Sequence, residues 1–116
     1  MDAKLAHLFG WYKKHDEQFK LDMWHSNTSK YATSSLDFST TWNGMQQVVE
    51  EMQRRGWDFA LESLTYDGIK YHARFFERIE GGYGEYDSEA SFPHAVCMAA
   101  LSALEGQRDE SNQRTN

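Results

Sequence analysis

The apolar residues near the N-terminus recur every three or four positions, which is the spacing of a helix that buries one face. From residue 3 to about residue 19 they are Leu5, Leu8, Phe9, Tyr12 and Phe19. We predict that the chain opens with a helix here, in which Gly10 marks a kink or a close helix contact. A short strand over residues 19–24 is a further option. The Ser, Thr and Asn that fill residues 26–41 predict a connection.

Two later segments combine helical spacing with signals for where a helix begins and ends. In residues 42–55 one face consists of Trp42, Met45, Val48, Val49 and Met52. Ser and Thr at 39–41 offer caps before this segment, and Gly56 follows its last turn. The other segment, residues 95–104, is rich in Ala and Leu. It follows a capping Ser91, and Pro93 stands in its first turn, where a missing N–H does no harm. Each segment predicts a helix.

Between these two helices the period changes to two, as in a strand with one buried face. The alternating apolar residues are Trp57, Phe59 and Leu61, then Tyr71, Ala73, Phe75 and Ile79. A Tyr-Asp-Gly turn at residues 66–68 separates the two runs and predicts a hairpin. Glycines at 81, 82 and 84 interrupt the pattern before residues 85–87, which we predict to return as a third, antiparallel strand.

The helices that precede and follow this sheet in the sequence must each bury an apolar stripe. If they cover both faces of the sheet, the many aromatic residues are accounted for. We therefore predict an α+β fold: an antiparallel three- to four-stranded sheet covered by helices on both faces, an α-β-α sandwich. A chain of 116 residues suffices for one core, so residues 1–104 are expected to form a single α+β domain. Residues 105–116 contain no large apolar side chain and predict a flexible C-terminal tail.

Composition and charge narrow the classes of function. No apolar run approaches the roughly 18 to 20 residues that cross a bilayer, and no basic segment precedes an apolar one at the N-terminus. The single cysteine, Cys97, cannot form an internal disulfide, which is typical of a reducing compartment. A formal net charge of −6 disfavours direct contact with nucleic acid or anionic membrane. We expect a cytoplasmic protein with basic partners.

Few residues offer catalytic or metal chemistry. His94 and Cys97 lie three apart on the predicted last helix and would share a side of it. Cys97 also lies among Val96, Ala99 and Leu101, where a free cysteine acts as a small buried hydrophobe. No CxxC, HxxxH or HExxH spacing occurs, and no P-loop lysine follows the glycine-rich turn. We predict no catalytic residue, no metal site and no cofactor.

Several short segments of the chain resemble a known family. They are LAHLFGW at residues 5–11, Trp24 with the Ser/Thr-rich stretch after it, STTWN at 39–43 leading into VVEEM at 48–52, and PHAVCMAAL at 93–101. The last of these is the most specific. Over roughly residues 5–104 the chain resembles the phage ABA sandwich domain family, small proteins of phages and prophages whose name describes helices on both faces of a sheet.

The resemblance implies a phage origin and that fold, and it implies no mechanism, because the family has no established common activity. In this context a small acidic protein is expected to act in the host cytoplasm as a non-enzymatic anti-defence inhibitor, for example of a CRISPR effector or a restriction enzyme. Its carboxylates would imitate phosphates and block a basic nucleic-acid-binding groove of a host defence protein.

The acidic residues concentrate in residues 77–89, where five acids stand against one base, Arg78. One interpretation is a solvated hairpin edge whose charge prevents edge-to-edge pairing. The other is an interaction surface, to which two interleaved tyrosines add anchoring area. The predicted partner-binding residues are Glu77, Glu80, Tyr83, Glu85, Tyr86, Asp87 and Glu89.

Two alternatives remain open. Lys70, Arg74 and Arg78 recur every four residues, so on one strand they would point to one face and form a basic strip beside His72. Such a strip, with aromatic residues to stack a base, is typical of a sponge that captures a small nucleotide signal of host immunity. The other alternative is a structural accessory role as a homodimer joined through a sheet edge.

Overall fold

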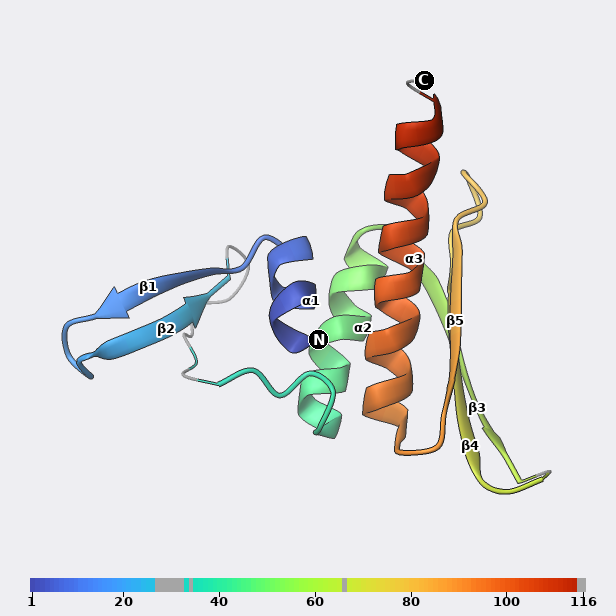
Figure 1. The fold of residues 1–116 in the computed structure, drawn as a ribbon, viewed down its shortest axis with the longest axis horizontal. Coiled ribbons are helices and arrows are strands. Elements are labelled where there is room, and N and C mark those ends of the chain that lie inside the picture. Colours follow the sequence, from blue (N-terminus) through green and yellow to red (C-terminus); the bar gives the residue numbers. More distant parts are fainter. Residues whose placement is uncertain (27–32, 34, 66, 115–116) are drawn as a thin grey trace.

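The computed structural model describes residues 1–26, 33, 35–65 and 67–114, which contain three helices and five strands (Figure 1). The helices are α1 (Asp2–Leu8), α2 (Trp42–Arg54) and α3 (Phe92–Arg114). The strands are β1 (Tyr12–Asp16), β2 (Leu21–His25), β3 (Asp58–Leu64), β4 (Lys70–Phe76) and β5 (Tyr83–Ser88). The predicted α+β class is confirmed.

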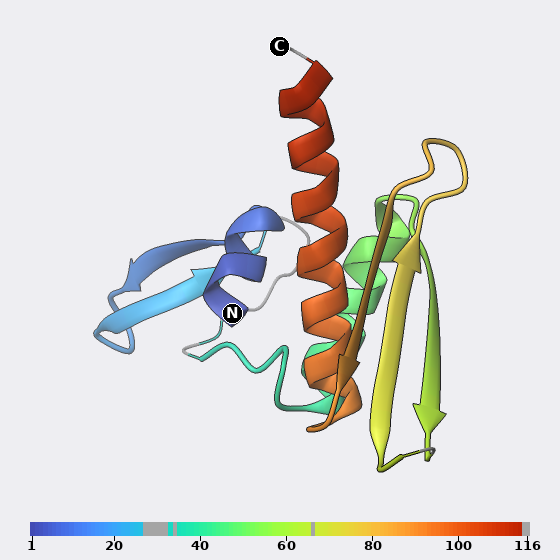
Figure 2. The ribbon, with the colours of Figure 1, turned by 45° about the vertical axis from the view of Figure 1, so that its right-hand side comes forward.

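The elements are arranged in layers. Strands β3, β4 and β5 form an antiparallel sheet in that order, and β1 and β2 form a separate hairpin. α2 and α3 lie on one face of the three-stranded sheet, and α1 and the hairpin lie beyond them (Figures 1 and 2). The antiparallel sheet follows the prediction. The helices, however, share one of its faces, whereas the prediction placed them on both.

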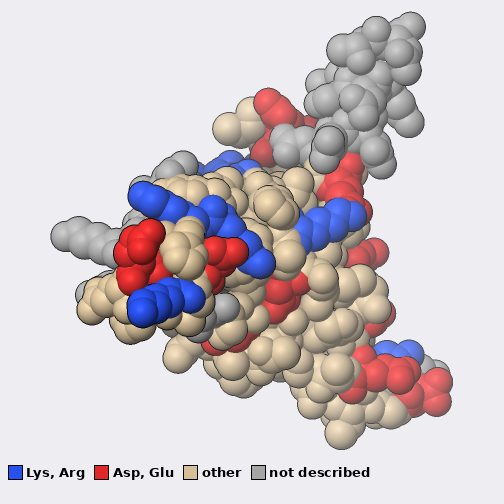
Figure 3. All heavy atoms as spheres, turned by 60° about the vertical axis from the view of Figure 1, so that its left-hand side comes forward, with Lys and Arg blue, Asp and Glu red and all other residues tan. Residues whose placement is uncertain are grey.

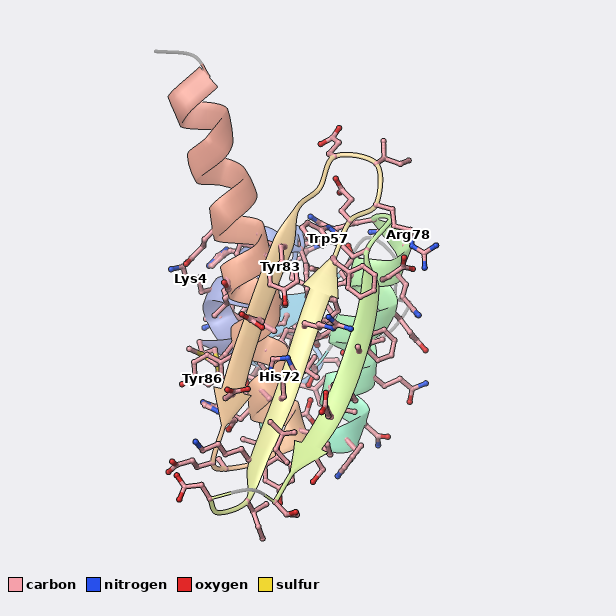
Figure 4. The ribbon with its side chains drawn as sticks, turned by 90° about the vertical axis from the view of Figure 1, so that its right-hand side faces the viewer. Lys4, Trp57, His72, Arg78, Tyr83 and Tyr86 are labelled. Atoms are coloured by element: carbon pink, nitrogen blue, oxygen red, sulfur yellow. The ribbon has the colours of Figure 1, made fainter. Side chains whose placement is uncertain are left out.

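The polarity of the sheet explains this arrangement. His72, Arg74 and Glu85 occupy its outer face, so that face has no apolar stripe that needs a helix. In the described part of the chain no helix lies over it (Figure 4). Leu5 and Ala6 of α1 are buried in the same core as the apolar residues of α2 and α3. All three helices therefore share one core on the inner side of the sheet.

The predicted N-terminal helix is wrong beyond its first turns. α1 ends at Leu8, and Gly10 has φ 83°, a conformation that ends a helix and that side chains other than glycine rarely adopt. Residues 12–25 form the β1–β2 hairpin instead, which confirms the optional strand in this region. Tyr12 and Phe19, which the helical pattern counted as buried, are 46% and 60% exposed.

α2 confirms the helix predicted for residues 42–55. The Gly44 N–H donates to Oγ1 of Thr41 at 2.9 Å, which caps the helix, and Gly56 follows its end with φ 94°. The predicted buried face is also confirmed, except for Trp42, which is 62% exposed. Most of the predicted connection before α2 is described and has no regular element, but residues 27–32 and 34 lie outside the described residues.

α3 begins where the sequence predicted, because the His94 N–H donates to Oγ of Ser91 at 3.2 Å. It continues to Arg114, so the predicted C-terminal tail is helical from residue 105 to 114, and residues 115–116 lie outside the description. Glu105 of α3 forms an ion pair with Lys4 of α1. No helix in the described ranges has both the length and the apolar character needed to cross a bilayer.

The predicted hairpin and the third antiparallel strand are both confirmed. β3 pairs with β4, and β4 with β5, each antiparallel. At the β3–β4 turn Asp67 and Gly68 have φ 57° and 100°, as the Asp-Gly pair predicts, while Tyr66 lies outside the described residues. Ile79 is 96% exposed in the β4–β5 turn, because β4 ends at Phe76. The apolar alternation of β4 therefore stops before it.

α3 lies unusually close to β5. Gly84 belongs to this strand, although the sequence pattern placed it among the glycines that precede it. A Cβ atom at residue 84 would lie 2.3 Å from the nitrogen of Ala103 and 2.6 Å from the carbonyl oxygen of Ala99. Real carbon atoms do not approach so closely, so only glycine permits this contact. The alanines of α3 allow the helix backbone to reach the strand.

We expect Gly84→Ala to lower the free energy of unfolding by about 3 kcal/mol, because the new methyl group must push α3 away from β5. Denaturant unfolding measures the change. The matched control is Gly106→Ala, where the nearest atom to the new Cβ lies 4.0 Å away. There the higher helix propensity of alanine should leave stability equal or raise it by about 1 kcal/mol. Equal losses in both variants would contradict the close contact.

Candidate functional site

The outer face of the three-stranded sheet gathers charged side chains from all three strands. Residues opposite each other in an antiparallel pair point to the same side, so the register defines this face. It consists of Asp58, Ala60, Glu62 and Leu64 on β3, of Lys70, His72, Arg74 and Phe76 on β4, and of Tyr83, Glu85 and Asp87 on β5. We call it the open face. His72 and Tyr83 project from it toward the viewer in Figure 4.

His72 lies at the centre of the charges on the open face. Its Nδ1 is 2.5 Å from Oδ1 of Asp87, and its Nε2 is 3.6 Å from Oε2 of Glu85. The Tyr83 hydroxyl donates to Oε2 of Glu85 at 3.0 Å. The His72 side chain is 19% exposed, whereas both carboxylates are 54% exposed. Two acids that face solvent are thus held in place by neighbours, which reduces the entropy they lose when a partner binds.

Basic side chains share this face but are outnumbered. Lys70 and Arg74 lie on β4, between the acids of β3 and those of β5. The Arg74 guanidinium lies over the ring of Phe76, 5.4 Å from its centroid. Arg78, the third member of the predicted basic strip, lies in the turn after β4, and its Nε is 2.7 Å from Oδ2 of Asp58. The strip therefore has two members on the open face.

The structure brings together three of the seven predicted partner-binding residues. Tyr83, Glu85 and Asp87 alternate along β5 and all face outward, with Tyr83 48% exposed. Tyr86 faces the helices instead, where its half-buried ring packs edge-on against the ring of His94 with centroids 5.7 Å apart. The side-chain alternation of a strand requires this separation.

The other three predicted residues lie beyond the ends of β5. Glu77 and Glu80 belong to the β4–β5 turn, whose backbone closes by a hydrogen bond from the Glu77 N–H to the carbonyl oxygen of Gly82 at 2.9 Å. Glu77 is half-buried, and its Oε1 has no partner among the described residues. Glu89 is exposed between β5 and α3. The predicted acidic segment is therefore spread over three places.

Sequence reasoning missed two acids and the histidine that complete the open face. The missed acids are Glu62, which lies opposite His72, and Asp58, which lies on the same face of β3. These residues are distant in the sequence, and only strand pairing makes them neighbours. One signal was available, since the period-two pattern already put His72 on the polar side of its strand.

On the opposite side of the molecule, the β1–β2 hairpin carries basic and acidic side chains in equal number. The β1–β2 hairpin carries lysines at 13, 14 and 20 and acids at 16, 17 and 22. Basic and acidic side chains alternate across this side in Figure 3. The hairpin thus contributes little net charge, and the open face is the better candidate for charge-directed binding.

Cys97 is buried, which confirms the interpretation that it packs in the core. Its side chain is fully inaccessible, and burial, together with the negative charge of Asp2, raises the pKa of its thiol well above the usual range. A thiol that stays protonated is a poor nucleophile. Cys97 is therefore a packing residue of α3.

A Ser–His pair, which the sequence did not reveal, joins β5 to α3. Oγ of Ser88 is 2.7 Å from Nδ1 of His94 and also accepts the Ala90 N–H at 3.0 Å. Ser88 is 2% exposed, so its hydroxyl holds the turn and does not face a substrate. In the described ranges no group of three His, Cys, Asp or Glu side chains could hold a metal ion.

Comparisons of the chain with protein-family models, with curated proteins and with solved structures find no match. The resemblance to the phage ABA sandwich domain family therefore stays a prediction. The function of the open face has to be inferred from its own geometry.

The raised pKa of Cys97 makes stability depend on pH. Its contribution to folding is complete below about pH 8.5, the pKa of a thiol in an unfolded chain. Above that pH the unfolded chain loses the proton and the folded chain keeps it, so stability falls. We expect the free energy of unfolding to fall more steeply with pH in the wild type than in Cys97→Ala. The two slopes should differ by about 1.4 kcal/mol per pH unit. Denaturant unfolding between about pH 8 and pH 10 measures this difference, and parallel curves would contradict it.

Proposed function

We propose that this protein is a non-enzymatic binding protein that uses its open face to bind a basic surface of a partner protein. The observation that carries the proposal is the acidic pair Glu85 and Asp87, which His72 and Tyr83 hold in place at the solvent-facing side of β5. Ordered carboxylates bind a matching basic surface with less loss of side-chain entropy than mobile ones.

Charge supports a basic protein as the partner. The chain has a formal net charge of −6, and the open face carries four acidic side chains and two basic ones. This excess steers a positively charged surface toward the face and repels nucleic acid and anionic membrane. The exposed ring of Tyr83 adds the apolar contact area that charges alone do not supply.

The regular spacing of the acids favours one class of basic partner. Carboxylates on one face of a strand recur about every 7 Å, so neighbouring strands present rows of negative charge, as a phosphate backbone does. We propose that the partner is a host defence protein, such as a CRISPR effector or a restriction enzyme, whose nucleic-acid-binding groove the open face blocks in the host cytoplasm. The phage origin in this proposal rests on the sequence resemblance alone.

A sponge for a small nucleotide signal is the second candidate. Lys70 and Arg74 support it, because they share the open face and Arg74 already lies over an aromatic ring. Glu62 and Glu85 lie on either side of these bases and would repel a phosphate group. Retention of a cyclic nucleotide in native mass spectrometry would favour the sponge over the protein partner.

We expect Glu85→Lys/Asp87→Lys to abolish capture of the partner from a host lysate in which defence systems are expressed. The variant replaces the two ordered acids by positively charged side chains, which a basic groove repels. The measurement is affinity capture followed by mass spectrometry, repeated at increasing salt, which should weaken the wild-type interaction.

The matched control for this experiment is Glu80→Lys/Glu89→Lys, which changes the net charge equally at exposed positions outside the open face. It should retain most of the capture. If both double variants lose the partner equally, net charge alone is responsible, and if neither does, the open face is not the binding surface.

A further inference from the structure

β3 is an edge strand of the three-stranded sheet. In the described part of the chain it pairs with β4 alone. The backbone N–H and C=O groups along the other side are therefore available to a further strand. β5 is the second edge of the sheet, and α3 packs closely on its inner face at Gly84, whereas large side chains separate β3 from α2. The two edges of the sheet are thus not equivalent.

An apolar groove of about 320 Å³ lies between β3 and α2. Trp42, Met45 and Val49 line it from the helix, and Phe59 and Leu61 from the strand. Trp42 is 62% exposed although the helical pattern of α2 places it on the buried face. The two β3 residues are only half-buried, although the strand alternation turns them toward the helices. The groove is an unfilled part of the core layer.

The groove has a packing cause. On the β5 side glycine and alanine let α3 touch the strand, whereas α2 and β3 face each other with large side chains such as Met45 of α2 and Phe59 of β3. Large side chains hold a helix further from a sheet than small ones do. The space at the β3 edge is therefore set by the sequence, and an added strand beside β3 would lie over it.

The acidic side chains near the groove indicate which kind of segment can bind there. Glu50 on α2 and Glu62 on β3 are exposed, and neither forms an ion pair within the described residues. The nearby basic residues are already paired, since Arg54 of α2 contacts Glu51, and Arg78 of the β4–β5 turn contacts Asp58 of β3. A second copy of this chain would bring two more acids to the edge and no free base. A basic segment of a partner complements the edge.

We propose that the β3 edge and this groove dock an extended segment of a partner protein in which apolar and basic side chains alternate. The segment adds to the sheet as a fourth strand through main-chain hydrogen bonds. Its apolar side chains enter the groove beside Phe59 and Leu61, and its basic side chains point to the other side, near Glu62. The inference does not rest on the proposed function, because Glu85 and Asp87 lie two strands away.

The probe is a synthetic peptide of about nine residues, long enough to span β3, in which valine and lysine alternate. We expect it to shift the amide resonances of residues 58–64 and the indole resonance of Trp42 in NMR spectra of the full chain. A valine–glutamate peptide of equal length should bind at least about tenfold more weakly, because Glu50 and Glu62 repel its glutamates. A valine–lysine peptide with N-methyl groups on alternate residues should bind as weakly, because it lacks the donors that pair with β3.

Variants of the chain provide a second test. Trp42→Ala and Glu62→Lys should each weaken binding of the valine–lysine peptide by about tenfold. Their matched controls are Ile79→Ala and Glu80→Lys, which alter exposed residues of the β4–β5 turn and should leave binding unchanged. Glu85→Lys/Asp87→Lys should also keep it, so loss of the open face and loss of the docking site are distinguishable. Thermal unfolding of each variant reports whether it is folded.

Three results would overturn the proposal. One is equal binding of the lysine and glutamate peptides, and another is a set of resonance shifts confined to the open face. The third is sedimentation of the isolated chain as a dimer whose β3 amides are protected from hydrogen exchange, because the occupant would then be a second copy.

Discussion

The contact between Gly84 of β5 and the backbone of α3 at Ala99 and Ala103 is the constraint on which the rest of the structure depends. Because Gly84 must face the helix, its neighbours Tyr83 and Glu85 must face away from it. The outward position of the acids on β5 is thus a consequence of packing. The same contact draws α3 over β4 and β5 and leaves β3 to the larger side chains of α2.

β3 links the two surfaces that result. On one side it contributes Glu62 and Asp58 to the open face, and on the other it turns Phe59 and Leu61 toward the groove. Glu62 therefore takes part in both the acidity of the open face and the acidic rim of the docking site. A partner with a basic surface and an extended basic segment can engage both without a conformational change of the sheet, and the linkage of two sites raises the overall affinity.

Local signals in the sequence were sufficient for the elements that local interactions decide. The Thr41 and Ser91 caps, the Asp-Gly turn and the period-two strands were predicted because each depends on neighbours in the chain. The N-terminal helix was wrong because helical spacing beyond residue 10 coincides with a hairpin, whose Trp24 is fixed by tertiary contacts with His7 and Thr33. Glu85 and Asp87 were assigned to the site because acids cluster in residues 77–89, and the same reasoning also included Tyr86, which faces the helices. His72 and Glu62 were not assigned to the site, because strand register is absent from the local pattern.

The polar groups that lie near one another at the start of α3 are occupied by structural contacts. Ser88 and His94 hydrogen-bond to each other while the serine holds the turn, and Cys97, one turn further along the helix, is buried with its thiol pKa raised. A nucleophile needs solvent access and a general base that is free to take its proton. Ser88, His94 and Cys97, on the buried side of the sheet, thus stabilise the fold. The exposed side presents the carboxylates of Glu85 and Asp87, which His72 and Tyr83 hold in place, and this is the arrangement on which the proposed recognition of a basic partner rests.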